Sequence, residues 1–174
     1  FGIGTRILSL VIIPAMSFGM TATTLVGNNL GARKFARAQQ IVKKNMKIAF
    51  SSLTILGILI FVFAAMIAEF FVPGEPKLVA SAAEFIRAMA LTFGLIGLQM
   101  TILGTLKSAG LTTPAMFLAM FQMLVLFVLG YFLSTNCGLA ARGIWLAYPI
   151  TNVVSAAAAF VFYFRKKWLR RETI

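Results

Sequence analysis

The stretch TLVGNNLGARKFARAQQ, from Thr24 to Gln40, decides how this chain folds. It begins as the end of an apolar segment, crosses two asparagines between Gly27 and Gly31, and then becomes strongly basic. Glycine adopts backbone conformations that end or redirect a helix. The stretch therefore predicts an apolar helix, a joint at which the chain turns, and a basic segment over residues 32–47.

The basic segment has two different faces when it is placed on a helix. One face carries four apolar side chains and a glutamine: Phe35, Ala38, Gln39, Val42 and Met46. The opposite face carries cations: Arg33, Arg37, Lys44 and Lys47. A helix with this pattern lies in the headgroup layer of a membrane, with its cations toward anionic lipid. The alternative is a solvated basic loop, which also belongs on the cytoplasmic side.

The composition extends the membrane interpretation to the whole chain. Of 174 residues, 60% are hydrophobic and only 11% are charged, whereas about a quarter of the residues of a soluble domain are charged. The formal net charge is +12, but the basic residues lie in short segments between apolar ones. That distribution is typical of the loops of a membrane protein and argues against nucleic acid as a partner.

Five segments are long and apolar enough to cross a bilayer. A hydrocarbon core about 30 Å thick requires roughly 20 apolar residues in a helix. The expected spans are about 2–27, 48–70, 85–106, 114–133 and 143–164. Stretches rich in glycine, proline and polar residues separate them. The sequence therefore predicts an all-α membrane protein with five transmembrane helices, located in the plasma or inner membrane.

The cations divide unequally between the two sides of the membrane. Twelve of the 16 Lys and Arg fall on one side: Arg33, Lys34, Arg37, Lys43, Lys44, Lys47, Lys107, Arg165, Lys166, Lys167, Arg170 and Arg171. The other side has Arg6, Lys77, Arg87 and Arg142. Cytoplasmic loops carry the excess of Lys and Arg. We therefore expect the N-terminus outside and the C-terminus in the cytoplasm.

The first span is polar along one side and apolar along the other. The polar side carries our candidates for lining a cavity: Arg6, Ser9, Ser17, Thr21, Thr24 and Asn28, with Met16 and Met20 as adaptable apolar neighbours. The opposite side carries Leu8, Val11, Ala15, Ala22 and Val26. Lipid offers hydroxyl and amide groups no partner, so the polar side must face protein or a water-filled cavity. The alternative is a helix–helix interface of small residues.

Two amide residues in other spans, Gln99 and Asn152, complete the list of candidates. Gln99 in the third span is either a hydrogen-bonded link between helices or a contact with the cavity, and Gln122 in the fourth span is equally ambiguous. Asn152 in the fifth span also needs a partner. The third span has a row of small residues that allows another helix to approach closely: Gly94, Gly97, Thr101, Gly104, Thr105 and Ser108.

The residue inventory excludes several kinds of chemistry. The chain has no His and no Asp, which removes the usual catalytic triads and the common zinc sites. Cys137 is the single cysteine, so the chain has no internal disulfide and no CxxC redox pair. We therefore expect no enzyme activity, no metal site and no bound cofactor.

Three stretches of this sequence resemble motifs of the multidrug and toxic compound extrusion (MATE) transporters. GIGTRILSLVIIPAMSFGMTATTLVGNNLGARKFARA, from Gly2 to Ala38, is similar to a repeated span and loop of the family. GTLKSAG, beginning at Gly104 and followed by TP, resembles the next motif. GLAARGIWLAYPITN, from Gly138 to Asn152, resembles the start of the last span. The motifs extend over the whole chain.

The resemblance implies a fold and a function. The family has twelve spans in two related six-helix lobes, and this chain corresponds to spans eight to twelve, most of one lobe, with the N-terminal lobe missing. Family members export amphipathic, often cationic organic compounds in exchange for H⁺ or Na⁺ by alternating access. The third span lacks the carboxylate that some branches use for coupling, so the coupling ion site is expected in the missing portion. The implied partners are membrane lipid, small organic substrates and the missing lobe.

Two other functions remain open. A lipid-linked sugar flippase or polysaccharide exporter of the related superfamily would need cations inside its cavity to bind pyrophosphate, and only Arg6 and Arg87 are available. A membrane scaffold subunit without transport activity would instead use the small-residue faces to bind a partner.

Overall fold

The computed structural model describes residues 2–71, 76–135 and 141–165. Cys137 and the cations from Lys166 onward lie outside these ranges, and the side chains of Arg6, Lys77 and Arg142 are also outside the described part. The regular structure of the described ranges is helical: α1 (Gly2–Gly31), α2 (Phe35–Val62), α3 (Ala64–Phe71), α4 (Pro76–Ala90), α5 (Phe93–Ser108), α6 (Thr112–Thr135) and α7 (Ala141–Phe164).

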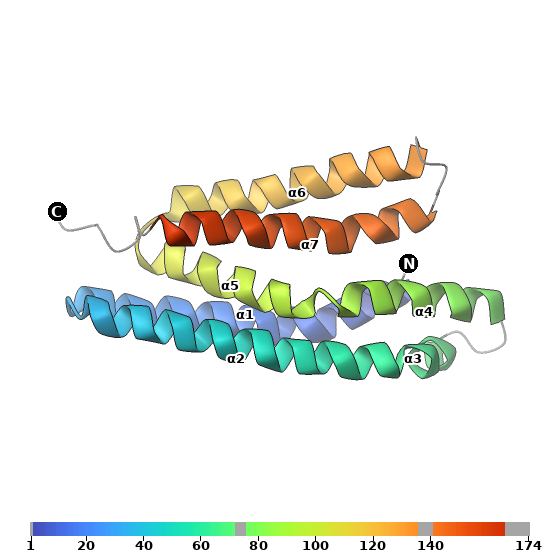
Figure 1. The fold of residues 1–174 in the computed structure, drawn as a ribbon, viewed down its shortest axis with the longest axis horizontal. Helices are drawn as coiled ribbons and strands as arrows, with labels where there is room; N and C mark the ends of the chain where they lie inside the picture. The colour runs from blue at the N-terminus through green and yellow to red at the C-terminus, as the bar shows by residue number, and fades with distance from the viewer. Residues whose placement is uncertain (1, 72–75, 136–140, 166–174) are drawn as a thin grey trace.

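The helices form two groups that meet at α5 (Figure 1). Helices α1, α2 and α5 pack against one another, and α6 and α7 pack side by side as a second group. Helix α5 contacts α7 more extensively than α6. Helix α4 extends the first group by contacting α2 and α3, and it also contacts α7 of the second group. The all-helical architecture agrees with the fold class predicted from the sequence.

The connection between α1 and α2 differs from the expected joint and separate basic helix. Helix α1 continues through both asparagines to Gly31, and the chain turns at Arg33, which has a φ of 55°. Residues 35–47 then form the first part of α2, which continues without interruption to Val62. The physical reason is packing: the apolar face of the basic segment is buried against Val26 of α1 and its neighbours, so this segment is anchored to the bundle.

The second and third spans are also more divided than the sequence predicted. Helix α2 ends at Val62, and α3 follows after Phe63. Helices α4 and α5 are bent relative to each other by 44° at a short break. At this break Thr92 donates its hydroxyl hydrogen to the carbonyl oxygen of Met89 at 2.9 Å, and the backbone N–H of Thr92 also donates to it. Local hydrogen bonds therefore replace the regular helical ladder there.

The number of candidate membrane spans agrees with the sequence prediction. Four helices of the described chain are long and apolar enough to cross a bilayer, and the bent α4–α5 pair counts as a fifth when it is taken as one span. Pro14 and Pro149 lie inside α1 and α7 respectively. The chain is therefore a multi-pass membrane chain.

Three connections that carry cations lie at one end of the bundle. Figure 1 places the α1–α2 turn, the α5–α6 turn and the end of α7 at its left end. We call this the basic end. Arg33, Lys107 and Arg165 belong to these three connections. The positive-inside rule requires such residues to share one side of the membrane, and the fold brings them together.

Helix α5 approaches α1 closely at a pair of glycines. A Cβ added to Gly104 would collide with the carbonyl oxygen of Gly19, and it would also lie 3.1 Å from the Thr23 hydroxyl oxygen. The Thr23 hydroxyl donates to the carbonyl oxygens of Gly19 at 3.0 Å and of Gly104 at 3.2 Å. The row of small residues on the third span thus permits the close helix contact that its composition predicts.

Candidate functional site

The two faces of α1 are in opposite environments. Val11, Ala15, Ala22 and Val26 are fully buried in the bundle. The polar face points away from the bundle, and five of its side chains are exposed: Ser9, Ser17, Thr21, Thr24 and Asn28. Helix α1 therefore attaches to this group of helices by its apolar side and leaves its polar side uncovered by the described residues.

Three hydroxyls on the polar face use their hydrogens within the helix. Ser17 donates to the carbonyl oxygen of Ile13 at 3.0 Å, and Thr21 donates to that of Ser17 at 2.8 Å. Thr24 donates to the carbonyl oxygen of Met20 at 3.1 Å. A hydroxyl has one hydrogen but two acceptor lone pairs. Each exposed oxygen is therefore left as an acceptor.

These three oxygens form what we call the acceptor row: Ser17, Thr21 and Thr24. With a rise of about 1.5 Å per residue, the row extends about 10 Å along the helix. Its spacing of four and then three residues keeps the oxygens on one side of α1. An organic molecule of ordinary size can contact more than one of them at a time.

Exposed methionines lie beside the acceptor row. Met16 is 52% exposed and Met20 is 68% exposed. A thioether side chain is flexible and polarisable, and it adapts to apolar groups of different shapes. The polar face of α1 thus combines oxygen acceptors with adaptable apolar surface.

The two amide candidates lie elsewhere. Gln99 is 2% exposed, and its Nε2 donates to Oε1 of Gln122 at 2.8 Å, which links α5 to α6. Asn152 is also buried, and its Nδ2 donates to the hydroxyl oxygen of Thr92 at 3.0 Å, which links α7 to the α4–α5 break. Both amides make bonds between helices, the other role that the sequence left open for Gln99. The side chain of Arg6 is outside the described part.

Sequence reasoning missed Asn45, which binds α1 on the side that packs against the bundle. This buried residue of α2 donates from Nδ2 to the carbonyl oxygen of Phe18 at 2.9 Å and to the Thr101 hydroxyl oxygen at 3.4 Å. It thereby joins α1, α2 and α5 one residue away from Ser17 of the acceptor row. The signal was available, because at 100° per residue Asn45 lies beside Ala38 and Val42 on the mainly apolar face of the basic segment.

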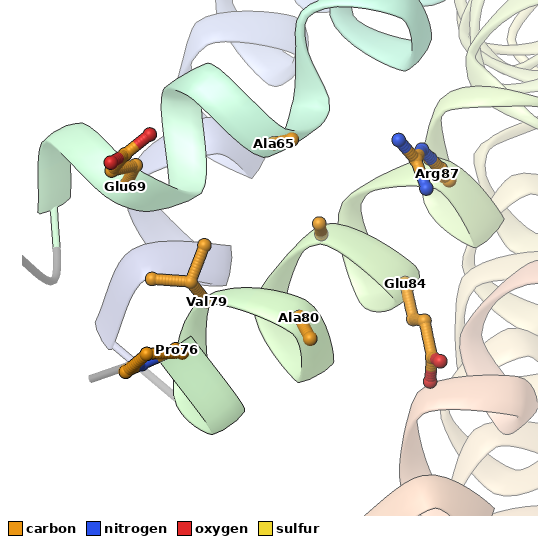
Figure 2. A pocket seen from close by; sticks show the side chains of 8 residues that line it. Ala65, Glu69, Pro76, Val79, Ala80, Glu84 and Arg87 are labelled. Atoms are coloured by element: carbon orange, nitrogen blue, oxygen red, sulfur yellow. The ribbon is translucent and has the colours of Figure 1, made fainter.

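A second feature, at the end of the bundle away from the basic end, does not join this site. A hollow of about 550 Å³ between α3 and α4 is lined by Glu69, Glu84 and Arg87, among others. Figure 2 shows the two carboxylates pointing to different sides of the hollow. The Arg87 guanidinium lies 5.9 Å from the centre of the Phe61 ring. Among the described residues no group of three His, Cys, Asp or Glu could hold a metal ion.

Comparison with known proteins decides the family. The MatE family model matches residues 1–132, about three quarters of the chain. The chain belongs to the MATE family. Its relatives include the probable multidrug resistance protein YpnP of Bacillus subtilis, 25% identical over 97% of this MATE chain and 37% of the relative. A protein named FAD transporter from Shewanella oneidensis is 24% identical over 92% of the chain and 35% of its own length.

A solved structure shares the fold of this MATE chain. The inward-facing conformation of a multidrug resistance MATE transporter matches 98% of the chain with a TM-score of 0.87 and 20% sequence identity. The chain covers 40% of that structure, so it spans well under half the length of the proteins it matches. The family and its structural neighbours are transporters rather than enzymes.

Proposed function

We propose that this chain forms most of one lobe of a secondary antiporter that exports amphipathic, often cationic organic compounds in exchange for H⁺ or Na⁺ by alternating access. The observation that carries the proposal is that the polar face of α1 is exposed while the opposite, apolar face is buried in the bundle. The YpnP relative is also named a probable multidrug resistance protein.

The polar face supports a cavity because no other helix of the described chain covers it. Hydroxyl and amide groups within a membrane require protein or water around them. The chain spans 37% of its YpnP relative, so the rest of a full-length transporter is available to face α1. A water-filled space between the two parts leaves the acceptor row reachable by a substrate.

The acceptor row also favours one charge of substrate. Ser17, Thr21 and Thr24 have no hydroxyl hydrogen to spare, so the row offers lone pairs to ammonium and other hydrogen-bond donors. An anion finds no partner among these three oxygens. We therefore rank a cationic compound as a substrate above a phosphate-bearing compound such as FAD, although another relative is named FAD transporter.

The same argument ranks the flippase alternative lower. A pyrophosphate substrate needs cations in the cavity. Arg87 lines the hollow between α3 and α4 instead, which leaves Arg6 alone of the two candidate cations on the polar side of α1. For the coupling ion, we assign the acidic residue to the remainder of the transporter, because both described carboxylates, Glu69 and Glu84, line that same hollow.

Transport in proteoliposomes tests the proposal. The full-length protein that contains this chain is reconstituted, and accumulation of a fluorescent organic cation is followed after a proton or sodium gradient is imposed. We expect transport of the cation with either gradient or both, and much slower transport of FAD. Transport that ignores both gradients contradicts antiport, and no transport of any probe favours the scaffold alternative.

A further inference from the structure

Helix α2 carries a stripe of cations and apolar residues on the side that faces away from the bundle, interrupted by the exposed Ser51 and Ser52. At about 100° per residue, Arg37 and Lys44 lie in line with the apolar residues that follow them toward Val62. The members are all exposed: Arg37, Lys44, Ile48, Ile55, Leu59 and Val62. We call this set the outward stripe of α2. The buried residues of the helix, such as Val42, Ala49 and Leu53, lie on the opposite side.

The stripe changes from charged to apolar at one point. Its first part, Arg37 to Lys44, covers about 10 Å, and its apolar part from Ile48 to Val62 covers about 21 Å at 1.5 Å per residue. Half of a hydrocarbon core about 30 Å thick is about 15 Å. The apolar part is therefore long enough to cross one leaflet, and the cations fall at the level of the headgroups.

The length of α2 requires it to extend beyond the hydrocarbon. The 28 residues from Phe35 to Val62 form a helix about 42 Å long, which exceeds the core by about 12 Å. The basic turns account for this excess. Because α2 is one continuous helix packed on α1 and α5, these turns stand upright at the membrane surface instead of lying flat in it.

The cations of the stripe have no carboxylate near them among the described residues. The described acids, Glu69 and Glu84, belong to α3 and α4, at the end of the bundle away from the basic end (Figure 1). Lys47 is exposed on the same side of α2 and adds to the local positive charge. An external anion is needed to balance this cluster.

We propose that the outward stripe of α2 binds an anionic phospholipid. The phosphate lies between Arg37 and Lys44, and one acyl chain lies along Ile48, Ile55 and Leu59. Long basic side chains reach a phosphate while their methylene groups cover apolar surface. The lipid holds the basic end of α2 at a defined depth in the membrane. The proposal concerns a surface other than the polar face of α1 and does not depend on transport.

Native mass spectrometry tests the proposal on the purified full-length protein that contains this chain. The protein in detergent is titrated with dioleoyl phosphatidylglycerol and, separately, with dioleoyl phosphatidylcholine. The test variant is R37Q/K44Q. The matched control is K107Q/R165Q, which also removes one Lys and one Arg from exposed positions at the basic end but leaves the stripe intact.

We expect the wild-type protein to retain phosphatidylglycerol in preference to phosphatidylcholine. Each cation that contacts the bound headgroup contributes about fivefold to anionic lipid binding, so R37Q/K44Q loses about thirtyfold. The control variant stays within about twofold of wild type because its cations lie outside the stripe. All four substitutions are at exposed positions, and circular dichroism verifies that the helices remain.

Three results would overturn the proposal. Equal losses in the two double variants mean that the surface attracts lipid only by diffuse charge. Equal retention of the two lipids means that the cations do not select the headgroup. Displacement of phosphatidylglycerol by millimolar inorganic phosphate means that the apolar part of the stripe contributes nothing.

Discussion

Substitution of Gly104 by alanine tests how α1 is held in position. The added Cβ points at the carbonyl oxygen of Gly19 and also lies 3.0 Å from the Gly19 carbonyl carbon. These are backbone atoms, which cannot rotate away. Ordinary contact between heavy atoms is about 3.5 Å, and the Gly19 oxygen is nearer to the added Cβ than the carbon is. Helices α1 and α5 must therefore separate by roughly 1 Å.

The expected cost follows from this geometry. Overpacking of a well-packed interior costs about 1–3 kcal/mol, and the upper value applies here because the neighbour is backbone. Alanine regains about 1 kcal/mol through its higher helix propensity. The net destabilisation is therefore about 2 kcal/mol, or a decrease in melting temperature of about 4–8 °C for a domain of this size.

A matched substitution has the opposite sign. A Cβ added to Gly130 of α6 would meet only the Cβ of Ala147, at 4.0 Å, which is ordinary contact. Gly130→Ala therefore keeps only the gain in helix propensity, about 0.5–1 kcal/mol. Both variants are compared with wild type by thermal and SDS-induced unfolding, followed by circular dichroism in detergent micelles.

The comparison refutes the packing argument if the two variants have the same melting temperature. A Gly104→Ala variant within about 0.5 kcal/mol of Gly130→Ala would show that α1 and α5 separate without cost, against the usual penalty for overpacking. The close contact between these helices would then not determine the position of the acceptor row.

Three further predictions concern the polar groups. In a cysteine-free background, Thr21→Cys reacts with a water-soluble maleimide at least about tenfold faster than Ile55→Cys. The reason is that lipid keeps the thiol at position 55 protonated and inaccessible. Equal reaction rates contradict a hydrated cavity at α1. Thr21→Val raises the half-saturating concentration of a cationic dye for transport about tenfold, because a hydrogen bond to a charged group is lost. The control Thr135→Val also removes an exposed hydroxyl bonded within its own helix. It leaves the half-saturating concentration unchanged. A double-mutant cycle of Gln99→Leu and Gln122→Leu yields a coupling energy of about 0.6–1.7 kcal/mol in unfolding measurements, and a value near zero refutes a stabilising bond between these side chains.

The spans were predictable because the membrane imposes their length and composition. A helix must be apolar for about 20 residues to cross the core, and the fourth and fifth expected spans, 114–133 and 143–164, fall within helices α6 and α7. The division of α1 into two faces was also predictable. Its buried residues Val11 and Ala15 and its exposed residues Ser17 and Thr24 follow the helical period.

The course of the chain from α1 into α2 was not predictable from the local sequence. The asparagines and glycines before Gly31 suggested a joint, yet α1 continues through them. The basic segment suggested a separate helix, yet it belongs to α2 because its apolar face is buried against α1. In both places contacts with other helices outweigh local preferences, which are weak by comparison.

The sequence by itself determined that this chain is a set of membrane helices, which side of α1 is polar, and which end of the bundle is basic. These properties depend on the nature of each residue and on the period of the helix, which are both local. The tertiary structure decided which polar groups are partners, because Gln99 and Gln122, or Thr92 and Asn152, meet only when α5, α6 and α7 pack together. It also left the acceptor row of α1 exposed, because the apolar back of that helix is the side that packs against α2 and α5.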